Sequence, residues 1–314
     1  MDLSVLIVNW NTAALLRGCL RSLRGALVPM KSGSAEVIVV DNASADGSAD
    51  LVRREFPEVR LIANQVNRNY AVGSNQGLAI AQGDLILLLN PDTEVSATAL
   101  ARLRQFLMVP ISSGAGGVAP RLVYPTGETQ ASVRGFPTPT ALFGEVTGFG
   151  RLFPRSRWGG YRRSPALDRP MPVDQPMASC LLLRRAALAE IGGFDEGLPL
   201  FWNDVDLCLR LHAAGWEIWY LPEAVVIHYG GASTRQVRAR AIWASHRGLH
   251  RLLSKHYRRR MPGPLYAISV AAIYAAGAVR VALAWLRARV PFRSRKLSGR
   301  PAAARPLPGE ENQW

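Results

Sequence analysis

The segment Leu85–Val95 reads LILLLNPDTEV, and it decides the fold class of the chain. Its five leading apolar residues run without a polar interruption, which is typical of a strand covered on both faces in a parallel sheet flanked by helices. Ligands of such sheets bind beyond the carboxyl ends of the strands, so Asp92 is predicted to lie at a ligand-binding edge. Pro, Asp and Thr are also ordinary turn residues, and a simple turn explains this segment equally well when it is taken alone.

Strand and helix patterns alternate on both sides of this segment. Apolar runs predict strands at residues 3–8, 36–41, 59–64 and 84–90. Helical spacing of apolar residues predicts helices at 12–27, 48–56, 72–81 and 96–107. The alternation predicts right-handed crossovers and a mainly parallel sheet flanked by helices, which is an α/β fold. Later patterns predict a strand and a short helix within 178–196, a helix at 203–216, and short strands at 217–222 and 224–229.

An aperiodic region and three isolated cysteines add to this prediction of the fold. Residues 127–176 show no clear period and are rich in Pro, Gly, Arg and aromatic residues, so a functional or mobile segment is expected there. The three cysteines, Cys19, Cys180 and Cys208, lie among apolar residues and form no CxxC pair. They are therefore predicted to be buried thiols in a reducing compartment.

The net charge of +15 is concentrated at the C-terminal end of the chain. Residues 246–314 contain 14 Lys and Arg and two Glu, whereas the preceding residues are nearly balanced. This distribution predicts a near-neutral catalytic or binding body with a basic tail. A nucleic-acid-binding protein is the competing hypothesis, but the tail charge is interleaved with a long apolar run and no aromatic-basic RNA motif is present. We therefore expect no nucleic-acid partner.

The C-terminal extension combines a basic segment with an apolar one. His246–Arg260 has leucines at helical spacing among basic residues, and Pro264–Leu286 is apolar except for Arg280. A charge in mid-membrane is costly, so attachment to an anionic membrane surface is favoured over a span, with a helix packed on the preceding domain as the alternative. The predicted organisation is a first domain, a pair of membrane-associating helices and a disordered tail, at residues 1–245, 246–292 and 293–314.

Acidic and imidazole groups recur at predicted element ends. They are Asp41, Asp92, Asp204, Asp206 and His228. Each has a simpler explanation, such as an Asx turn, helix-start acids behind an Asn203 N-cap, or a buried histidine with its hydrogen bonds satisfied. Taken together they suit group transfer from an activated nucleotide. One acid and one His match a divalent metal such as Mg²⁺ or Mn²⁺, and a second carboxylate matches a general base.

Signatures of other nucleotide-binding and hydrolytic enzymes are absent. The chain has no GxGxxG between a strand and a helix, no GxxxxGK[ST] and no GxSxG, and GSNQG at residues 73–77 is no match for the nucleotide-binding motifs. A dinucleotide oxidoreductase, a P-loop NTPase and a serine hydrolase are therefore disfavoured.

Seven segments resemble, in order, the family 2 glycosyltransferases with a GT-A fold, and especially their bacterial rhamnosyltransferase-like branch. The segments are SVLIVNWN, VIVVDNASADGS, NRNYAVGSNQGL, GDLILLLNPDTEV, LLLRRAALAEIGGFDE, FWNDVDLCLRLHAAGW and VVIHYGGAST. They cover roughly residues 3–235. The resemblance implies a GT-A fold followed by a basic and apolar helical extension.

The resemblance also implies donor-binding residues. Asp41 is similar to the family acid that binds the nucleobase of the sugar donor. The backbone around Val8 and Asn9 would line the nucleotide, and Asn75 is placed with the donor-binding residues. Asn69 stands where relatives often have Gly, and Asn is the next-best residue if that position needs a positive φ.

The remaining implied roles concern the metal and the base. Asp92 resembles the last acid of the DxD-type motif that holds Mg²⁺ or Mn²⁺ and the donor diphosphate, and His228 resembles the histidine that contributes to the same site. Asp204 resembles the general base that deprotonates the acceptor hydroxyl, although Asn203 stands where the family commonly has an acid. The helix macrodipole predicts a lowered pKa for Asp204.

The implied reaction is a metal-dependent, inverting displacement at the anomeric carbon. We expect rhamnose from dTDP-rhamnose to be transferred to a lipid-linked or polysaccharide acceptor in cell-surface glycan synthesis. Another donor such as a UDP-hexose is the alternative. The expected location is the cytoplasmic face of the bacterial inner membrane, with peripheral or monotopic attachment, and residues 127–176 are expected to shape the acceptor side.

Overall fold

The first half of the chain follows the predicted alternation of strands and helices. The structure is a computed structural model that describes residues 1–109, 114–147, 152–153, 156, 168–230 and 238–289. Its first elements are β1 (Leu3–Asn9), α1 (Ala13–Leu27), β2 (Ala35–Asp41), α2 (Ser48–Glu55), β3 (Arg60–Ala63), α3 (Asn69–Ile80), β4 (Leu85–Leu89), β5 (Thr93–Val95) and α4 (Ala97–Met108). Each strand and helix predicted before residue 108 is therefore confirmed, with ends that differ by a few residues.

The second half contains longer excursions between the strands. Its elements are β6 (Ala115–Val123), β7 (Val133–Arg134), α5 (Pro139–Thr147), β8 (Met171–Pro172), β9 (Gln175–Pro176), β10 (Cys180–Arg184), α7 (Arg185–Ile191), α8 (Asn203–Ala213) and β11 (Glu217–His228). The two short strands predicted at 217–222 and 224–229 form the single strand β11. Its register shifts between Leu221 and Val225, where Pro222 lacks the N–H that a regular ladder needs.

The main sheet is parallel in one half and mixed in the other. Its strand order is β3-β2-β1-β4-β10-β6-β11-β5, and β8 pairs with β11. The strands β3, β2, β1 and β4 are parallel, as the alternating pattern predicts. β10 is antiparallel to both of its neighbours, β4 and β6. The chain reaches β10 after a long excursion, which leaves its direction free of the constraint that a short helical crossover imposes.

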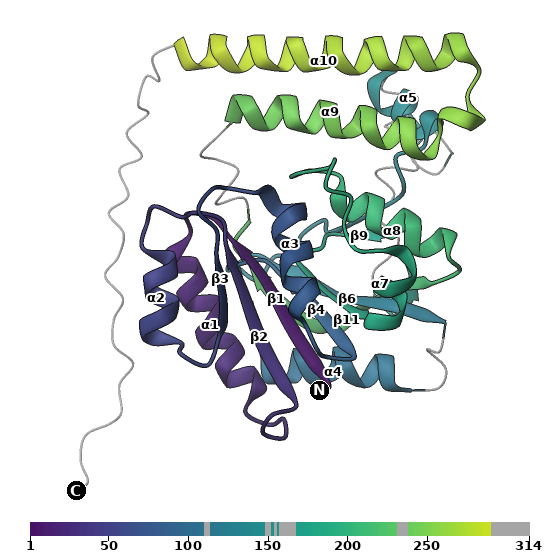
Figure 1. Cartoon of the computed structure of the whole chain (residues 1–314). Helices are drawn as coiled ribbons and strands as arrows, with labels where there is room; N and C mark the ends of the chain where they lie inside the picture. Colours follow the sequence, from purple (N-terminus) through teal and green to yellow (C-terminus); the bar gives the residue numbers. More distant parts are fainter. Residues whose placement is uncertain (110–113, 148–151, 154–155, 157–167, 231–237, 290–314) are drawn as a thin grey trace, which may run out of the picture.

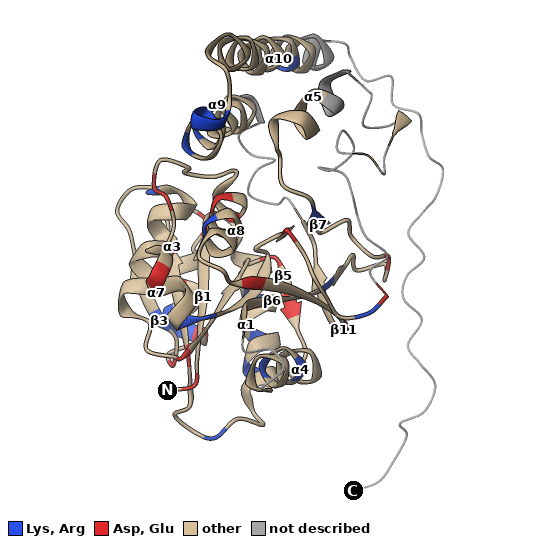
Figure 2. Cartoon of the chain, turned by 90° about the vertical axis from the view of Figure 1, so that its right-hand side faces the viewer, with Lys and Arg blue, Asp and Glu red and all other residues tan. Residues whose placement is uncertain are grey.

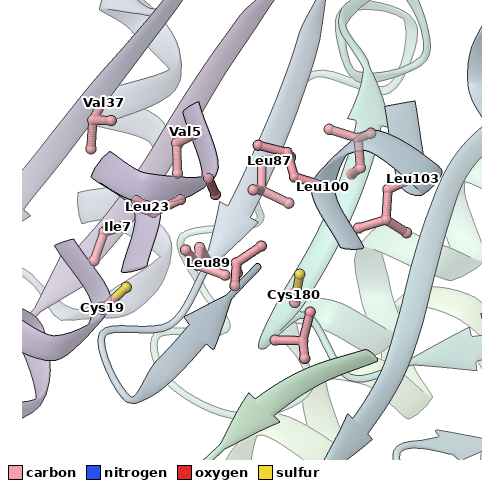
Figure 3. Packing of buried hydrophobic residues seen from close by; sticks show 14 of the residues in the cluster. Val5, Ile7, Cys19, Leu23, Val37, Leu87, Leu89, Leu100, Leu103 and Cys180 are labelled. Atoms are coloured by element: carbon pink, nitrogen blue, oxygen red, sulfur yellow. The ribbon is translucent and has the colours of Figure 1, made fainter. Parts of the chain in front are cut away.

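Helices cover both faces of this sheet. All five residues of β4 are buried, as expected for a strand covered on both sides. Figure 3 shows one face, where Val5, Ile7, Leu87 and Leu89 meet the apolar side of α1 and α4. α2 also packs on this face, and α3, α7 and α8 cover the other. The three cysteines are buried and free, which confirms the prediction of unpaired thiols.

α3 packs closely on β1 and begins with a left-handed residue. A Cβ at Gly77 would lie 2.0 Å from Leu6 Cδ1, so only Gly allows this approach of the helix to the strand. Asn69, the first residue of α3, has φ +67°. The tolerance of Asn for this conformation explains how it replaces Gly there.

The C-terminal extension is helical. It consists of α9 (Arg238–His256), a 3₁₀ turn at Arg258–Arg260 and α10 (Gly263–Arg289). The two helices lie side by side beyond the edge where the parallel strands end (Figure 1). α9 begins before residue 246, the predicted start of the extension, and the predicted disordered tail at 293–314 lies outside the described residues.

Candidate active site

A cavity of about 300 Å³ lies at the carboxyl ends of the parallel strands. Its walls come from strand ends, from the segment before α8 and from α3. The lining residues are Val8, Tyr70, Asn90, Pro91, Asp92, Met177, Ala178, Ser179, Leu200, Phe201, Asn203, Asp204 and His228. Val8, Asp92, Asp204 and His228, four of the predicted site residues, therefore share one cavity.

Asp92 and His228 are brought together by strand pairing. β5 follows Asp92 directly, and it pairs antiparallel with the end of β11 so that Thr93 lies opposite His228. The Tyr229 N–H donates to the Asp92 carbonyl at 2.9 Å and extends this ladder. As a result, His228 Nε2 lies 3.4 Å from Asp92 Oδ1, and both residues are buried.

Gln130 fixes the ring of His228. Its Nε2 donates to the His228 carbonyl at 2.5 Å, and its Oε1 lies 2.8 Å from His228 Nδ1. Because an amide oxygen only accepts, Nδ1 carries the proton in this arrangement. In the neutral imidazole the Nε2 lone pair then faces the Asp92 carboxylate, and two acceptors at this distance need a proton or a cation between them.

This donor set fits a divalent cation such as Mg²⁺ or Mn²⁺. Asp92 offers an oxygen and His228 a nitrogen oriented by a hydrogen bond behind it. Among the described residues, no group of three or more His, Cys, Asp or Glu side chains could hold a metal. A cation here would therefore need ligands other than His, Cys, Asp or Glu side chains to complete its coordination.

Asp204 is the second carboxyl group of the cavity. It lies in the first turn of α8 and is half-buried. Burial raises the pKa of Asp204 above its ordinary value, and the N–H of Val205, which donates to Oδ1 at 2.9 Å, opposes this only in part. The lowered pKa expected from the helix macrodipole is therefore wrong, because desolvation of the carboxylate outweighs the helix-end N–H groups.

Asn203 is built into the start of the same helix. Its Oδ1 accepts from the Asp204 N–H at 2.7 Å, and its Nδ2 donates to the Leu200 carbonyl at 3.1 Å. The N-cap position is occupied by Trp202, so the interpretation of Asn203 as N-cap is off by one residue. An acid at position 203 could not donate to Leu200, which explains how an amide is accommodated here.

Asn9 and Asp41 form a separate pair at neighbouring strand ends. They lie opposite each other in the β1–β2 register, and Asn9 Nδ2 donates to Asp41 Oδ1 at 2.9 Å. Asp41 Oδ2 accepts from the Ser44 N–H at 3.0 Å, so the simpler Asx-type turn is also present. Both side chains are buried beside the cavity wall formed by Val8.

Asn75 is not brought together with the other predicted donor-binding residues. Its Nδ2 donates to the Phe194 carbonyl at 3.0 Å and its Oδ1 accepts from the Phe194 N–H at 2.9 Å. Nδ2 also lies 3.1 Å from Glu196 Oε1. The amide therefore ties α3 to the GGFDE turn after α7.

The site also includes groups that sequence reasoning missed. Gln130, which holds His228 from behind, lies in the aperiodic region 127–176, where no pattern singles out a residue. Tyr70 lines the cavity, and burial raises its pKa to about 12, so its phenol remains a hydrogen-bond donor. Ser179 holds the segment before Asp92, because its Oγ accepts from Asn90 Nδ2 at 3.1 Å.

Comparisons with known proteins identify the family of the chain. The family model of Glycosyl transferase family 2 matches residues 4–191. The chain is 29% identical over 233 residues to an N-acetylglucosaminyl-diphospho-decaprenol L-rhamnosyltransferase of Mycobacterium tuberculosis, covering 70% of this chain and 75% of that protein. It is 36% identical over 69 residues to the rhamnosyltransferase WbbL of Escherichia coli, covering 22% of this chain and 26% of that protein.

A solved structure supports the fold. The mannosyltransferase PcManGT from Pyrobaculum calidifontis, in complex with GDP-Man and Mn²⁺, superposes with a TM-score of 0.56 at 18% identity, covering 91% of this chain and 74% of that chain. This likeness confirms the predicted GT-A fold. The matched family model spans more than half of the chain, and the protein is therefore an enzyme of glycosyl transferase family 2.

Proposed function

We propose that the protein transfers a sugar from a nucleotide-diphosphate donor to a lipid-linked or polysaccharide acceptor, with inversion at the anomeric carbon. The observation that carries this proposal is the presence of Asp204 and the Asp92–His228 pair in one cavity at the carboxyl edge of the sheet. The pair provides a site for a cation and a diphosphate. Asp204 provides a base that is separate from that site.

Asp204 would accept the proton of the acceptor hydroxyl as that oxygen attacks the anomeric carbon. Its raised pKa, which results from burial, strengthens it as a base. Asp92 and His228 would hold Mg²⁺ or Mn²⁺, which when bound neutralises the charge that develops on the diphosphate leaving group. A single displacement needs no enzymatic nucleophile, and it inverts the configuration.

The names of the relatives support rhamnose as the transferred sugar, with dTDP-rhamnose as the donor. A UDP-hexose is the alternative donor. The test incubates the protein with Mn²⁺, dTDP-rhamnose and an N-acetylglucosaminyl-diphospho-polyprenol, and NMR determines the anomeric configuration of the product. Opposite configurations in donor and product are expected. Retention would contradict the single displacement, and turnover with UDP-glucose instead would select the alternative.

The pH dependence of transfer should respond to the charge at position 203. Asn203→Asp places a second carboxylate beside Asp204, which disfavours ionisation of the base. The acidic limb of the kcat–pH profile is therefore expected to move to higher pH. Asn203→Ala, which also loses the bond to Leu200 but adds no charge, is the matched control and should leave the limb in place. An unmoved limb in Asn203→Asp would mean that Asp204 does not control it.

The proposed location is the cytoplasmic face of the bacterial inner membrane, on an anionic lipid surface. In the described part of the chain, one helix is long and apolar enough to cross a membrane, the segment Gly263–Trp285 of α10. α10 is almost entirely tan in Figure 2, which reflects its lack of charged residues apart from a few Arg. Its exposed apolar residues include Leu265, Ile268, Val279 and Leu283.

The packing of α10 on α9 supports attachment in the plane of the membrane. His250 of α9 lies between two tyrosines of α10: its Nε2 is 3.1 Å from the Tyr266 hydroxyl oxygen, and its Nδ1 is 2.9 Å from the Tyr274 hydroxyl oxygen. Further along, a Cβ at Gly277 would lie 3.1 Å from His246. If α10 crossed the bilayer in this arrangement, the basic helix α9 would enter hydrocarbon with it, at a high cost. An interfacial α10 keeps α9 in the aqueous layer, and the arginines at 258–260 can contact anionic headgroups.

Charges on the outer face of α10 should release the protein from vesicles. Replacement by Glu would cost Ile268 and Leu283 roughly 1.5–3 kcal/mol each in lost apolar burial, so the double variant should bind phosphatidylglycerol vesicles at least about 100-fold more weakly. Flotation measures the bound fraction. The control carries Val28→Glu and Met108→Glu, which alter residues that are 76% and 72% exposed, directly after α1 and at the end of α4. Equal flotation of both variants would contradict α10 as the attachment site.

A further inference from the structure

The segment that leads into Asp204 has an unusual backbone. Trp202 has φ +68°, a left-handed conformation that a bulky residue rarely adopts. It occupies the N-cap position of α8, between two cavity-lining residues, Phe201 and Asn203. The backbone at Trp202 therefore sets the direction in which Asp204 enters the cavity. Such a conformation persists only where surrounding contacts hold it.

Those contacts come from α9. Trp202 Nε1 donates to the Ser245 carbonyl at 2.7 Å. Gly248, one turn further along α9, lies against the same indole, and a Cβ there would lie 2.8 Å from Trp202 Cδ1 and 3.2 Å from the Phe201 carbonyl oxygen. A glycine in the middle of a helix is unfavourable, so its presence where the indole needs the space favours a packing role.

Apolar contacts extend the same interface. Leu252 of α9 forms a buried cluster with Leu198 and Val205, and Trp202 packs against it. Leu198 precedes the segment 200–204, all of which lines the cavity except Trp202, and Val205 follows it. α9 therefore contacts this segment on both sides of Asp204.

Ion pairs complete the attachment of α9 to α8. Asp206 is fully buried, and its Oδ1 accepts from Lys255 Nζ and His256 Nε2, each at 2.7 Å. Burial raises the pKa of Asp206, but the bonds from His256 and Lys255 outweigh it, so the pKa lies below the ordinary value. Asp195 pairs with Arg251 at 2.7 Å and with Lys255 at 2.9 Å. The Asp206 pairs join α9 to the first turn of α8, and the Asp195 pairs join α9 to the turn after α7.

We propose that Trp202 is a positioning residue for Asp204, and that α9 holds it through Ser245 and Gly248. The inference rests on the proposed function, because Asp204 is the base only if that proposal is correct. α10 packs on the opposite side of α9 from this contact, so α9 lies between the proposed membrane-binding helix and the segment that leads into Asp204 (Figure 1).

Two variants of the full-length protein test this role. Trp202→Phe keeps an aromatic ring but removes the indole N–H that reaches Ser245. Gly248→Ala places a methyl group where the indole lies. Gly25→Ala is the matched control, because Gly25 is also inside a helix and nothing lies within 4 Å of its added Cβ. The measurements are kcat, its pH profile, the donor Kd by calorimetry and the Tm.

We expect kcat to fall by about 10-fold in Trp202→Phe and by about 10- to 100-fold in Gly248→Ala, since misplacement of a reacting group by about 1 Å can cost about 100-fold. The donor Kd should stay within about twofold. The acidic limb of the kcat profile should move, because the burial of Asp204 changes with its position. Gly25→Ala should match the wild type in kcat and Kd.

Two results would overturn the inference. One is an unchanged kcat and pH profile in both variants. The other is a lower Tm with a parallel loss of donor binding and an unmoved pH limb, which is what a purely structural role predicts. Asp204→Asn separates this inference from the proposed function. If Asp204→Asn retains transfer, the assignment of the base is wrong; if it loses transfer while both variants keep the wild-type kcat, only the role of Trp202 is wrong.

Discussion

Asp204→Asn is expected to lower the transfer rate by about 100- to 10,000-fold, which is the usual contribution of a general base. Asn has almost the same shape as Asp, and its Oδ1 can still accept from the Val205 N–H. The change therefore removes the proton acceptor and leaves the cavity wall in place. Steady-state transfer assays measure the loss, and calorimetry should give a donor Kd within a few-fold of the wild type.

A control for this change exists at another helix start. Asp50 lies in the first turn of α2, where its side chain is 71% exposed and pairs with Arg53. Asp50→Asn makes the same chemical change outside the cavity and should leave kcat unaltered. Transfer by Asp204→Asn at a rate near that of Asp50→Asn would show that another group, or solvent, takes the proton.

Asp92→Ala is expected to abolish the metal-dependent part of donor binding. The variant loses the carboxylate that faces His228 Nε2, so the cation would keep a single protein ligand. Loss of a residue that merely supports a ligand costs about 10- to 100-fold in metal affinity, and loss of a ligand should cost at least about 100-fold. The donor Kd is measured once with Mn²⁺ and once with EDTA, and the two values should be equal in the variant.

The matched control is Asp84→Ala, because Asp84 is an exposed acid that immediately precedes β4, at the end opposite to Asp92. It should keep the wild-type response to Mn²⁺. A donor Kd for Asp92→Ala that still tightens with Mn²⁺ would place the cation on other residues.

The fold was predictable where local patterns determine it. The apolar runs and helical spacings before residue 108 predict β1 to β4 and α1 to α4, because the apolar residues of these elements recur at strand or helix spacing. The three-residue strand β5 was not predicted, since it follows the turn at Asp92 and depends on pairing with β11. The antiparallel direction of β10 was not predictable, since it depends on the path of the chain through residues 124–179. The union of two predicted strands into β11 also depends on a neighbour, because β6 continues past the irregularity at Pro222.

The site was predictable in part for the same reason. Asp92 and Asp204 stand at the ends of predicted elements, where an acid beside an apolar pattern can be recognised from the sequence as a candidate functional group. Gln130 and Trp202 carry no such signal, because their roles arise from contacts with His228 and α9 that are distant in sequence. Asp206 resembles a solvated helix-start acid, and its burial follows from the docking of α9.

The central claim is that the cavity binds a sugar nucleotide through a cation held by Asp92 and His228. Isothermal titration calorimetry of the full-length protein with dTDP-rhamnose, UDP-glucose, UDP-galactose and GDP-mannose, each with Mn²⁺ and then with EDTA, tests it most directly. The account predicts that one donor binds with Mn²⁺ and that EDTA removes the binding. Binding of that donor with equal affinity in EDTA, or no binding of any donor in Mn²⁺, would contradict it.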